Sequence, residues 1–301
     1  MLTIGSRGSQ LALWQARWIQ ARIQSFGVET RLEIIHTTGD KITDVALSKV
    51  GTKGLFTKEI EEALLSRAID LAVHSLKDMP TELPDGLMLA AIPEREDPRD
   101  AMVGRSLDAL ASKAKVGTSS LRRAAQLRAK RPDLEIENIR GNLDTRLRKL
   151  DEGQYDAIVL ASAGLRRLGW ENRITELLDP EIMCPAVGQG ALAVETRADG
   201  GEAELLAKRL EHRESRIAVT AERALLAALG GGCQVPIGAY ATVDGEVVHL
   251  RAIIVSPDGT EIIRKRAGGA SRDAAVIGRA LGEELLAQGG RQILEAVYGT
   301  A

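Results

Sequence analysis

The chain has 301 residues, of which 44% are hydrophobic and 27% are charged, and its formal net charge is −2. This length is enough for two or three domains with cores of their own, and the near-zero charge argues against nonspecific binding to nucleic acid or to an anionic membrane. No apolar run reaches the roughly 18 residues that a membrane-spanning helix needs, and the N-terminal segment lacks the pattern of a signal peptide, so we expect a cytoplasmic protein.

The first third of the chain alternates strand and helix patterns. Residues 2–5 and 32–35 favour short strands, and residues 11–25 place apolar side chains at helical spacing. Thr57 is a suitable N-cap for a helix to about residue 67, and residues 69–74 form an apolar run typical of a buried strand. This alternation predicts a parallel or mixed sheet with helices on both faces.

A second series of strands and helices follows a charged segment at residues 94–100, which contains Pro98 and is interpreted as a crossing between domains. One strand is expected to end at Gly117. Two further strands are expected at residues 134–139 and 157–161. Three helices are expected, at residues 119–130, from Asn142 or Asp144 to residue 150, and at residues 162–168.

The last third has a different pattern. A helix is expected at residues 214–229, where three glycines end it, and Ser271 is expected to cap a final helix to about residue 288. Between these helices lie three expected strands, separated by turn residues, at 237–243, 247–255 and 261–266. The sequence therefore predicts an α/β protein with a C-terminal α+β domain that contains an antiparallel sheet.

Cysteine and histidine are sparse. The two cysteines, Cys184 and Cys233, are too few for a disulfide framework, and both are expected to be reduced. The four histidines are scattered and match no metal-binding motif, so no metal site is expected.

Small hydroxyl residues and arginines gather where expected strands end and helices begin. The segment 117–123 has the sequence GTSSLRR, the segment 140–146 repeats the theme with RGNLDTR, and Arg7 and Ser9 precede the first helix. Free N–H groups and the helix dipole favour an anion at such positions, and arginine adds bidentate contacts to carboxylates. The plain structural alternative is a set of capped helices with solvated arginines.

Two further segments contain residues suited to catalysis. Asp78 follows a buried strand in a turn fixed by Pro80, where catalytic residues of α/β proteins stand, although a lone aspartate in a turn is more often a backbone cap. Cys233 follows three glycines. On such a loop, a role as nucleophile or attachment point is as consistent with the sequence as a role in packing. Cys184 has no such loop and is interpreted as structural.

These segments together resemble the porphobilinogen deaminase family, and the resemblance covers nearly the whole chain. The matching segments, in chain order, are LALWQA at 11–16, KGLF at 53–56, HSLKD at 74–78, EREDPRD at 94–100, GTSSLRR at 117–123, RGN at 140–142, PAVGQG at 185–190 and GGCQVP at 231–236. Any one of them is weak, but their joint order is highly specific.

The resemblance implies two α/β domains like those of periplasmic binding proteins, which flank a cleft, and a C-terminal α+β domain with a three-stranded antiparallel sheet. Domain 1 is expected to comprise residues 1–94 with 191–210, domain 2 residues 95–190, and domain 3 residues 211–301. A monomer is the family expectation.

The resemblance also implies the activity of a hydroxymethylbilane synthase. Such a transferase condenses four porphobilinogen molecules head to tail with release of ammonia, on a dipyrromethane cofactor, and then releases the linear tetrapyrrole by hydrolysis. The cofactor is expected as a thioether on Cys233, with Asp78 as the catalytic group and Lys77 in support. The other residues implied to contact the cofactor are Lys53, Ser75, Thr118, Ser119, Arg122, Arg123 and Gly188. Those implied to contact the substrate are Arg7, Ser9, Gln15, Arg140, Asn142, Arg146 and Arg167.

Two functions of other classes remain open on the residues alone. A solute receptor would explain the arginines and the paired α/β domains, but not Cys233 on its glycine-rich loop or a third domain. A transferase that uses Cys233 as a turnover nucleophile would explain the loop, but no histidine is placed in the sequence to suggest its base. Neither nucleic acid nor a membrane is expected as a partner.

Overall fold

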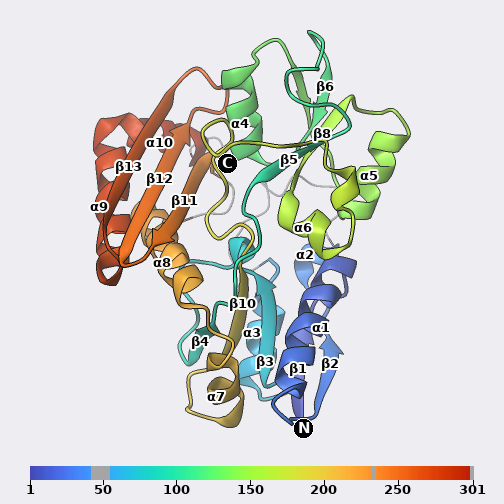
Figure 1. The fold of residues 1–301 in the computed structure, drawn as a ribbon, viewed down its shortest axis with the longest axis vertical. Helices are drawn as coiled ribbons and strands as arrows, with labels where there is room; N and C mark the ends of the chain where they lie inside the picture. The colour runs from blue at the N-terminus through green and yellow to red at the C-terminus, as the bar shows by residue number, and fades with distance from the viewer. Residues whose placement is uncertain (42–54, 232–234, 299–301) are drawn as a thin grey trace.

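A computed structural model describes residues 1–41, 55–231 and 235–298 (Figure 1). Within these ranges the strands form two five-stranded sheets and one three-stranded sheet. None of the described helices has the length and apolar character needed to cross a membrane.

The first sheet has the strand order β2-β1-β3-β10-β4 and occupies the lower part of Figure 1. Its strands are β1 (Leu2–Ser6), β2 (Thr30–Ile34), β3 (Leu71–Ser75), β4 (Leu87–Ala91) and β10 (Leu192–Arg197). Strand β1 is parallel to β2 and β3, whereas β10 is antiparallel to β3 and β4, so the sheet is mixed as predicted.

Helices cover both faces of this sheet. Helices α1 (Gln10–Gln24) and α7 (Glu202–Lys208) contribute to one apolar cluster, in which Ile4, Ile19 and Val194 are fully buried. Helix α3 (Lys58–Leu65) contributes to a cluster on strand residues such as Ala72. The short helix α2 (Thr38–Lys41) follows β2. Thr57 occupies the N-cap position of α3, but its side chain makes no capping hydrogen bond, which corrects the predicted cap.

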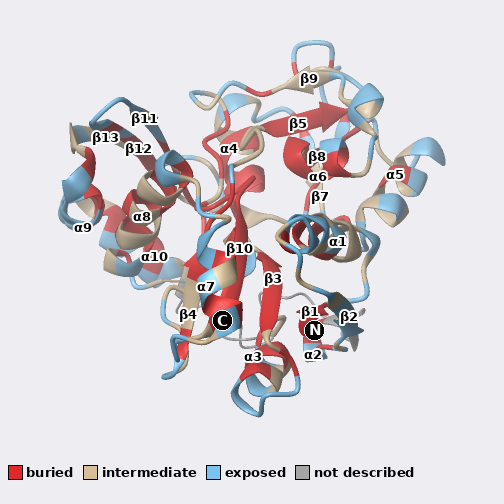
Figure 2. Cartoon of the chain, turned by 60° about the horizontal axis from the view of Figure 1, so that its bottom comes forward, coloured by how far each residue is buried: buried red, intermediate tan, exposed pale blue. Residues whose placement is uncertain are grey.

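The second sheet has the order β7-β6-β8-β5-β9, which corresponds position by position to the first. Its strands are β5 (Asp100–Val103), β6 (Lys115–Gly117), β7 (Glu135–Glu137), β8 (Ala157–Ala161) and β9 (Glu176–Leu177), and its helices are α4 (Leu121–Lys130), α5 (Leu143–Asp151) and α6 (Ser162–Arg167), with a short turn η3 (Glu171–Arg173). Strands β6, β7 and β8 are parallel, and β5 is antiparallel to β8 and β9. Figure 2 shows that β3, β5 and β10 are buried, whereas the outer side of α5 is exposed.

The third sheet is an antiparallel meander of β11 (Ile237–Asp244), β12 (Val247–Val255) and β13 (Ile262–Ala270). Helices α8 (Arg213–Ala228), α9 (Ala274–Leu285) and α10 (Arg291–Tyr298) accompany it on the left of Figure 1. Helix α9 lies close against α8 at Gly278, where the absence of a side chain permits the contact. A Cβ at this position would come within 2.1 Å of the Ala221 carbonyl oxygen. The predicted α+β composition of this region is confirmed.

Three local expectations for this region are wrong. Strand β13 continues to Ala270, beyond the predicted end at residue 266. Ser271 lies inside the short turn η4 (Ser271–Asp273), and α9 begins one turn later with Asp273 at its N-cap. The helix also ends at Leu285, because Gly289 adopts a φ of 105° in the turn η5 (Leu286–Gly290), after which the separate helix α10 begins.

Candidate active site between the two α/β sheets

The turn after β3 places Lys77 and Asp78 at the C-terminal end of this central strand of the first sheet. The Leu76 N–H donates to the Ala191 carbonyl at 3.0 Å, and the Met79 N–H donates to the Leu76 carbonyl at 3.0 Å. Leu76 and Met79 are each 2% exposed, which anchors the turn η2 (Leu76–Asp78) in the core. Asp78 is exposed and Lys77 is half-buried, so both side chains remain available at the strand end.

Helix α1 begins beside this turn. Gln15 is 2% exposed, and its Nε2 donates to the Ser75 Oγ at 3.0 Å. Ser9 caps the helix by accepting a hydrogen bond from the Ala12 N–H at 3.3 Å. Arg7 lies over the ring of Phe56, with 4.1 Å between the guanidinium carbon and the ring centroid. The structure therefore brings Ser75 and Gln15 together at the strand end.

The second sheet has polar residues at the C-terminal end of β6. Thr118 is buried and accepts a hydrogen bond from the Ser120 N–H at 3.2 Å through its Oγ1. Ser120, and not Ser119, is the N-cap of α4, because its Oγ accepts from the Arg123 N–H at 3.5 Å. The helix accordingly begins at Leu121, two residues later than predicted, and Ser119 is exposed at the turn.

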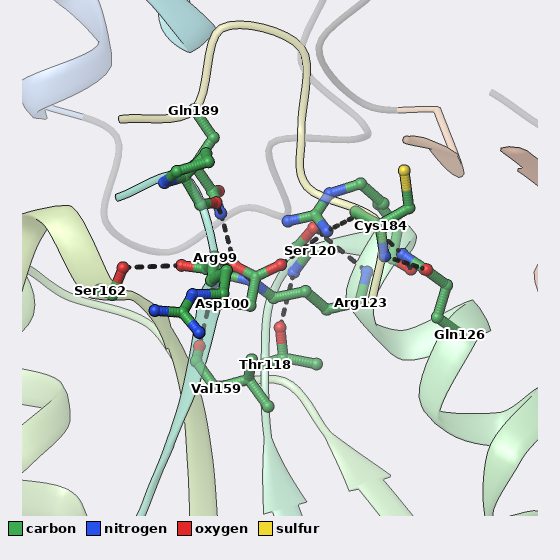
Figure 3. A network of polar contacts seen from close by, with 12 residues as sticks. Arg99, Asp100, Thr118, Ser120, Arg123, Gln126, Val159, Ser162, Cys184 and Gln189 are labelled. Atoms are coloured by element: carbon green, nitrogen blue, oxygen red, sulfur yellow. Dashed lines mark hydrogen bonds and ion pairs between the residues drawn. The ribbon is translucent and has the colours of Figure 1, made fainter. Parts of the chain in front are cut away.

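Arg122 and Arg123 are buried on a carboxylate that the sequence did not single out, that of Asp100. Figure 3 shows Asp100 and Arg123 within this network. Arg122 Nη1 lies 2.7 Å from Asp100 Oδ2, and Arg123 donates to Asp100 Oδ1 from Nη2 at 2.7 Å and from Nε at 3.0 Å. Gln189 Nε2 donates to the same Oδ1 at 2.9 Å. The alternative of two solvated arginines is therefore wrong for this helix.

The two arginines outweigh the charge of Asp100. Burial raises the pKa of this carboxyl, but Arg122 and Arg123 together hold it well below its ordinary value. Two positive charges on one carboxylate leave a net positive charge inside the network. The sequence pattern did identify the arginines, whereas Asp100 lies in the charged segment 94–100 and its burial at the start of β5 depends on long-range folding.

Asp100→Asn is expected to destabilise the fold by about 3–5 kcal/mol, because two buried arginines lose their counterion. Urea unfolding at pH 7 measures this change. Since the folded pKa of Asp100 is depressed, its contribution is present above the ordinary carboxyl pKa of about 4 and is lost as the pH falls further. Asp133→Asn is the control, because Asp133 pairs with Arg131 on the exposed surface, and an equal loss there would contradict the expectation.

Further cations act on the same region. Burial lowers the pKa of Lys77 to about 8, and Arg123 and Arg122 act in the same direction, whereas Asp78 and Asp100 oppose the shift. Burial likewise lowers the pKa of Arg146 to about 10, with Arg123 and Arg140 acting in the same direction. Lys77 after β3 and Arg146 of α5 therefore each lie within electrostatic range of Arg123 on α4.

The remaining predicted residues differ in their contacts. Arg167 is buried, with a pKa that burial lowers to about 10, and its Nη2 donates to the Gly190 carbonyl at 2.6 Å. Asn142 is exposed at the N-cap position of α5 without a capping hydrogen bond. Gly188 has a φ of +69°, and a Cβ there would come within 2.9 Å of the Leu76 side chain. Lys53 and Cys233 lie outside the described residues.

A hollow of about 550 Å³ lies at the other end of the second sheet's strands, near the start of β8. None of the predicted site residues lines it. Its lining includes Arg105, Tyr155 and the ion pair of Arg173 with Asp151. We place the candidate site at the strand ends instead, since the converging cations are there and ligands of α/β sheets bind at the carboxyl ends of strands.

Comparisons with known proteins agree with the sequence resemblance. The family model "Porphobilinogen deaminase, dipyromethane cofactor binding domain" matches residues 2–205, and "Porphobilinogen deaminase, C-terminal domain" matches residues 216–287. The porphobilinogen deaminase of Syntrophobacter fumaroxidans is 52% identical over 303 residues, which cover 99% of this chain and 98% of the relative. That of Brevibacillus brevis is 52% identical over 300 residues, which cover 98% and 96%.

A solved periplasmic substrate-binding protein of an ABC transporter from Coxiella burnetii aligns with 74% of this chain and 97% of its own, at 13% identity and a TM-score of 0.44. The fold assignment rests on the strand orders, and the family assignment rests on the full-length matches. The chain belongs to the porphobilinogen deaminase family, the transferases of tetrapyrrole biosynthesis that condense porphobilinogen on a dipyrromethane cofactor.

Proposed function

We propose that porphobilinogen is condensed at the strand ends, between the turn after β3 and the starts of α4 and α5, with Asp78 as the acid–base group. One observation carries this proposal: Lys77 and Asp78 stand at the end of β3, and Arg122 and Arg123 of the second sheet lie close enough to shift the pKa of Lys77. A catalytic carboxylate and a set of cations thus meet where a ligand with several carboxylates would bind.

The residues present fit the cofactor that the family implies. Each pyrrole unit carries an acetate and a propionate, so a dipyrromethane brings several carboxylates to the site. The charged neighbours that shift the pKa of Arg146 are themselves arginines. The two positive charges of Arg122 and Arg123 also exceed the single negative charge of Asp100. Such a surplus of buried positive charge is stabilised by an anionic ligand. When bound, the cofactor supplies the free pyrrole carbon to which the first substrate ring is joined.

We assign two tasks to the side chains of the catalytic turn. The Asp78 carboxylate stabilises positive charge that develops on a pyrrole during loss of ammonia, and it accepts the ring proton that is released after condensation. Lys77, with a pKa of about 8, is mostly protonated at neutral pH and holds a ligand carboxylate beside Asp78. Because Leu76 and Met79 anchor the turn on both sides, these groups are held in place before the substrate arrives.

The other assignments follow from position. We propose that the cofactor contacts Ser75, Thr118, Ser119, Arg122, Arg123 and Gly188, with Cys233 as its thioether partner and Lys53 as a further contact. The proposed substrate contacts are Arg7, Ser9, Gln15, Arg140, Asn142, Arg146 and Arg167. Arg122 and Arg123 serve mainly through their charge, because Asp100 already engages both guanidinium groups.

We also propose the domain division 1–94 with 191–210, 95–190 and 211–301. Strand β10 supports it, because it returns to the first sheet between β3 and β4 after the chain has passed through the second sheet. A cytoplasmic monomer is the proposed state, and the family supports porphobilinogen as the substrate.

Intact-mass measurement of the purified protein tests the proposed function. The expected mass exceeds that of the chain by two condensed pyrrole units, because the primer is retained through purification as a covalent adduct. Incubation with porphobilinogen is expected to add further units one at a time and to release ammonia. A chain of unmodified mass that still forms the tetrapyrrole would contradict the proposed primer.

A further inference from the structure

Helix α8 of the third domain contacts the segment directly after the catalytic turn. Arg223 Nη2 donates to the Pro80 carbonyl at 2.7 Å and to the Thr81 carbonyl at 3.1 Å. One helical turn earlier, Val219 is 1% exposed and shares an apolar cluster with Leu76 and Met79. The same face of α8 therefore holds the turn by apolar packing and by hydrogen bonds from a charged donor.

The C-terminal end of α8 contacts this segment a second time. The Gly231 N–H donates to the Leu226 carbonyl at 2.9 Å, and Gly231 has a φ of +59°. A Cβ at Gly231 would lie 3.0 Å from the Thr81 Oγ1, so the helix end passes directly beside Thr81. In the sequence, Cys233 follows Gly231 by two residues.

Glu222 links α8 to three other parts of the chain by hydrogen bonds. Its buried carboxylate accepts hydrogen bonds from Arg95 Nη1 at 2.6 Å, from the Gly188 N–H at 2.7 Å and from the Ala241 N–H at 2.8 Å. These donors come from the segment between β4 and β5, from the loop before β10 and from β11. The position of α8 is thus fixed against three parts of the chain beside Arg223.

We propose that Arg223 is a positioning residue for Asp78. It ties the Pro80–Thr81 backbone to α8, so that the acid–base group keeps a fixed position relative to the helix whose glycine-rich end leads to Cys233. Arginine suits this task because one guanidinium nitrogen has two hydrogens for two successive carbonyls. This inference rests on the proposed role of Asp78.

The test compares Arg223→Gln and Arg223→Lys with a matched control, Arg216→Gln. Arg216 lies on the same helix, and its Nη2 donates to the Leu89 carbonyl of the first sheet at 3.0 Å, but this contact lies away from the turn. Hydrogen exchange of the backbone amides of residues 76–79 and 81 measures the opening of the turn, and intact mass confirms that each variant carries the cofactor. Steady-state kinetics then gives kcat and KM.

For Arg223→Gln we expect exchange at residues 76–79 and 81 to become about tenfold faster, because a charged donor to two carbonyls is lost. We expect kcat to fall by about 10-fold to 100-fold with little change in KM, as for a misplaced catalytic group. Arg223→Lys should recover part of both losses. Arg216→Gln should leave the turn's exchange and kcat near those of the parent chain.

The proposal is overturned if Arg223→Gln leaves the exchange of the turn unchanged, or if Arg216→Gln produces the same losses. Failure of the proposed function gives a different result. If Asp78 is not the catalytic group, Asp78→Asn retains turnover, while the exchange effect of Arg223→Gln is still observed.

Discussion

Asp78→Asn is expected to lower turnover by at least about 100-fold and to leave folding unchanged. Asparagine keeps the shape of the side chain but removes its charge and its ability to accept a proton. Because Asp78 is exposed and the buried neighbours Leu76 and Met79 anchor the turn, the substitution does not disturb the core. Single-turnover measurement of ring addition, with thermal unfolding of the same sample, checks both parts of the expectation.

Asp85→Asn is the control, because Asp85 is also exposed and lies before β4, outside the turn that contains Asp78. The pH dependence gives a second check. Asp78 raises the pKa of Lys77, so its loss lowers that pKa further below about 8, and Lys77 loses its proton at a lower pH. The activity that remains in Asp78→Asn should therefore decline at a lower pH than in the parent chain. Turnover close to that of the parent chain would reject the assignment.

The elements that local pattern identified are those with strong periodicity or clear boundaries. The strand expected at residues 157–161 is β8, because five small or apolar residues lie between turn signals and are buried on both faces. The helix expected at residues 214–229 is α8, since its apolar residues recur at helical spacing and three glycines follow it. In such segments the local pattern and the tertiary packing agree.

The elements that local pattern missed depend on distant parts of the chain. Strand β10 lies between β3 and β4, more than a hundred residues from both, and only the family resemblance indicated the return of the chain near residues 192–210. The helix α10 was missed because the glycines at 289 and 290 resembled the end of the chain's last helix. Neither feature has a signal within a short window of sequence.

The same distinction holds for the candidate site. Clusters of arginine beside small hydroxyl residues identified α4, but they did not show that Asp100 neutralises part of its charge. Glu222 and Arg223 occupy a helix that looks ordinary in the sequence, and most of their partners, such as Gly188 and Pro80, lie more than thirty residues away. Buried charges are fixed by several long-range contacts at once, so they become recognisable only in the folded chain.

The two cysteines of the chain differ in chemical environment, which predicts where the cofactor is attached. Cys184 is 2% exposed in an apolar cluster with Ala125, Ile253 and Val255, and burial raises the pKa of its thiol to about 12. Its thiolate is therefore scarcely formed near neutral pH, and an electrophilic pyrrole cannot reach it. Cys233 lies outside the described residues, but it follows three glycines, which leave room for a bulky adduct.

Cys233→Ser is expected to abolish nearly all of the cofactor and the turnover, because the serine hydroxyl is a much weaker nucleophile than a thiolate near neutral pH. Intact mass and the colour reaction of pyrroles with an acidic aldehyde reagent measure the adduct. Cys184→Ser is the matched control and should keep both the adduct and the activity, with some loss of stability from a hydroxyl in an apolar cluster. An adduct that persists in Cys233→Ser and disappears in Cys184→Ser would reverse the assignment. A permanent primer on Cys233 also distinguishes this sulfur from a turnover nucleophile, since the adduct mass should be the same before and after many rounds of product release.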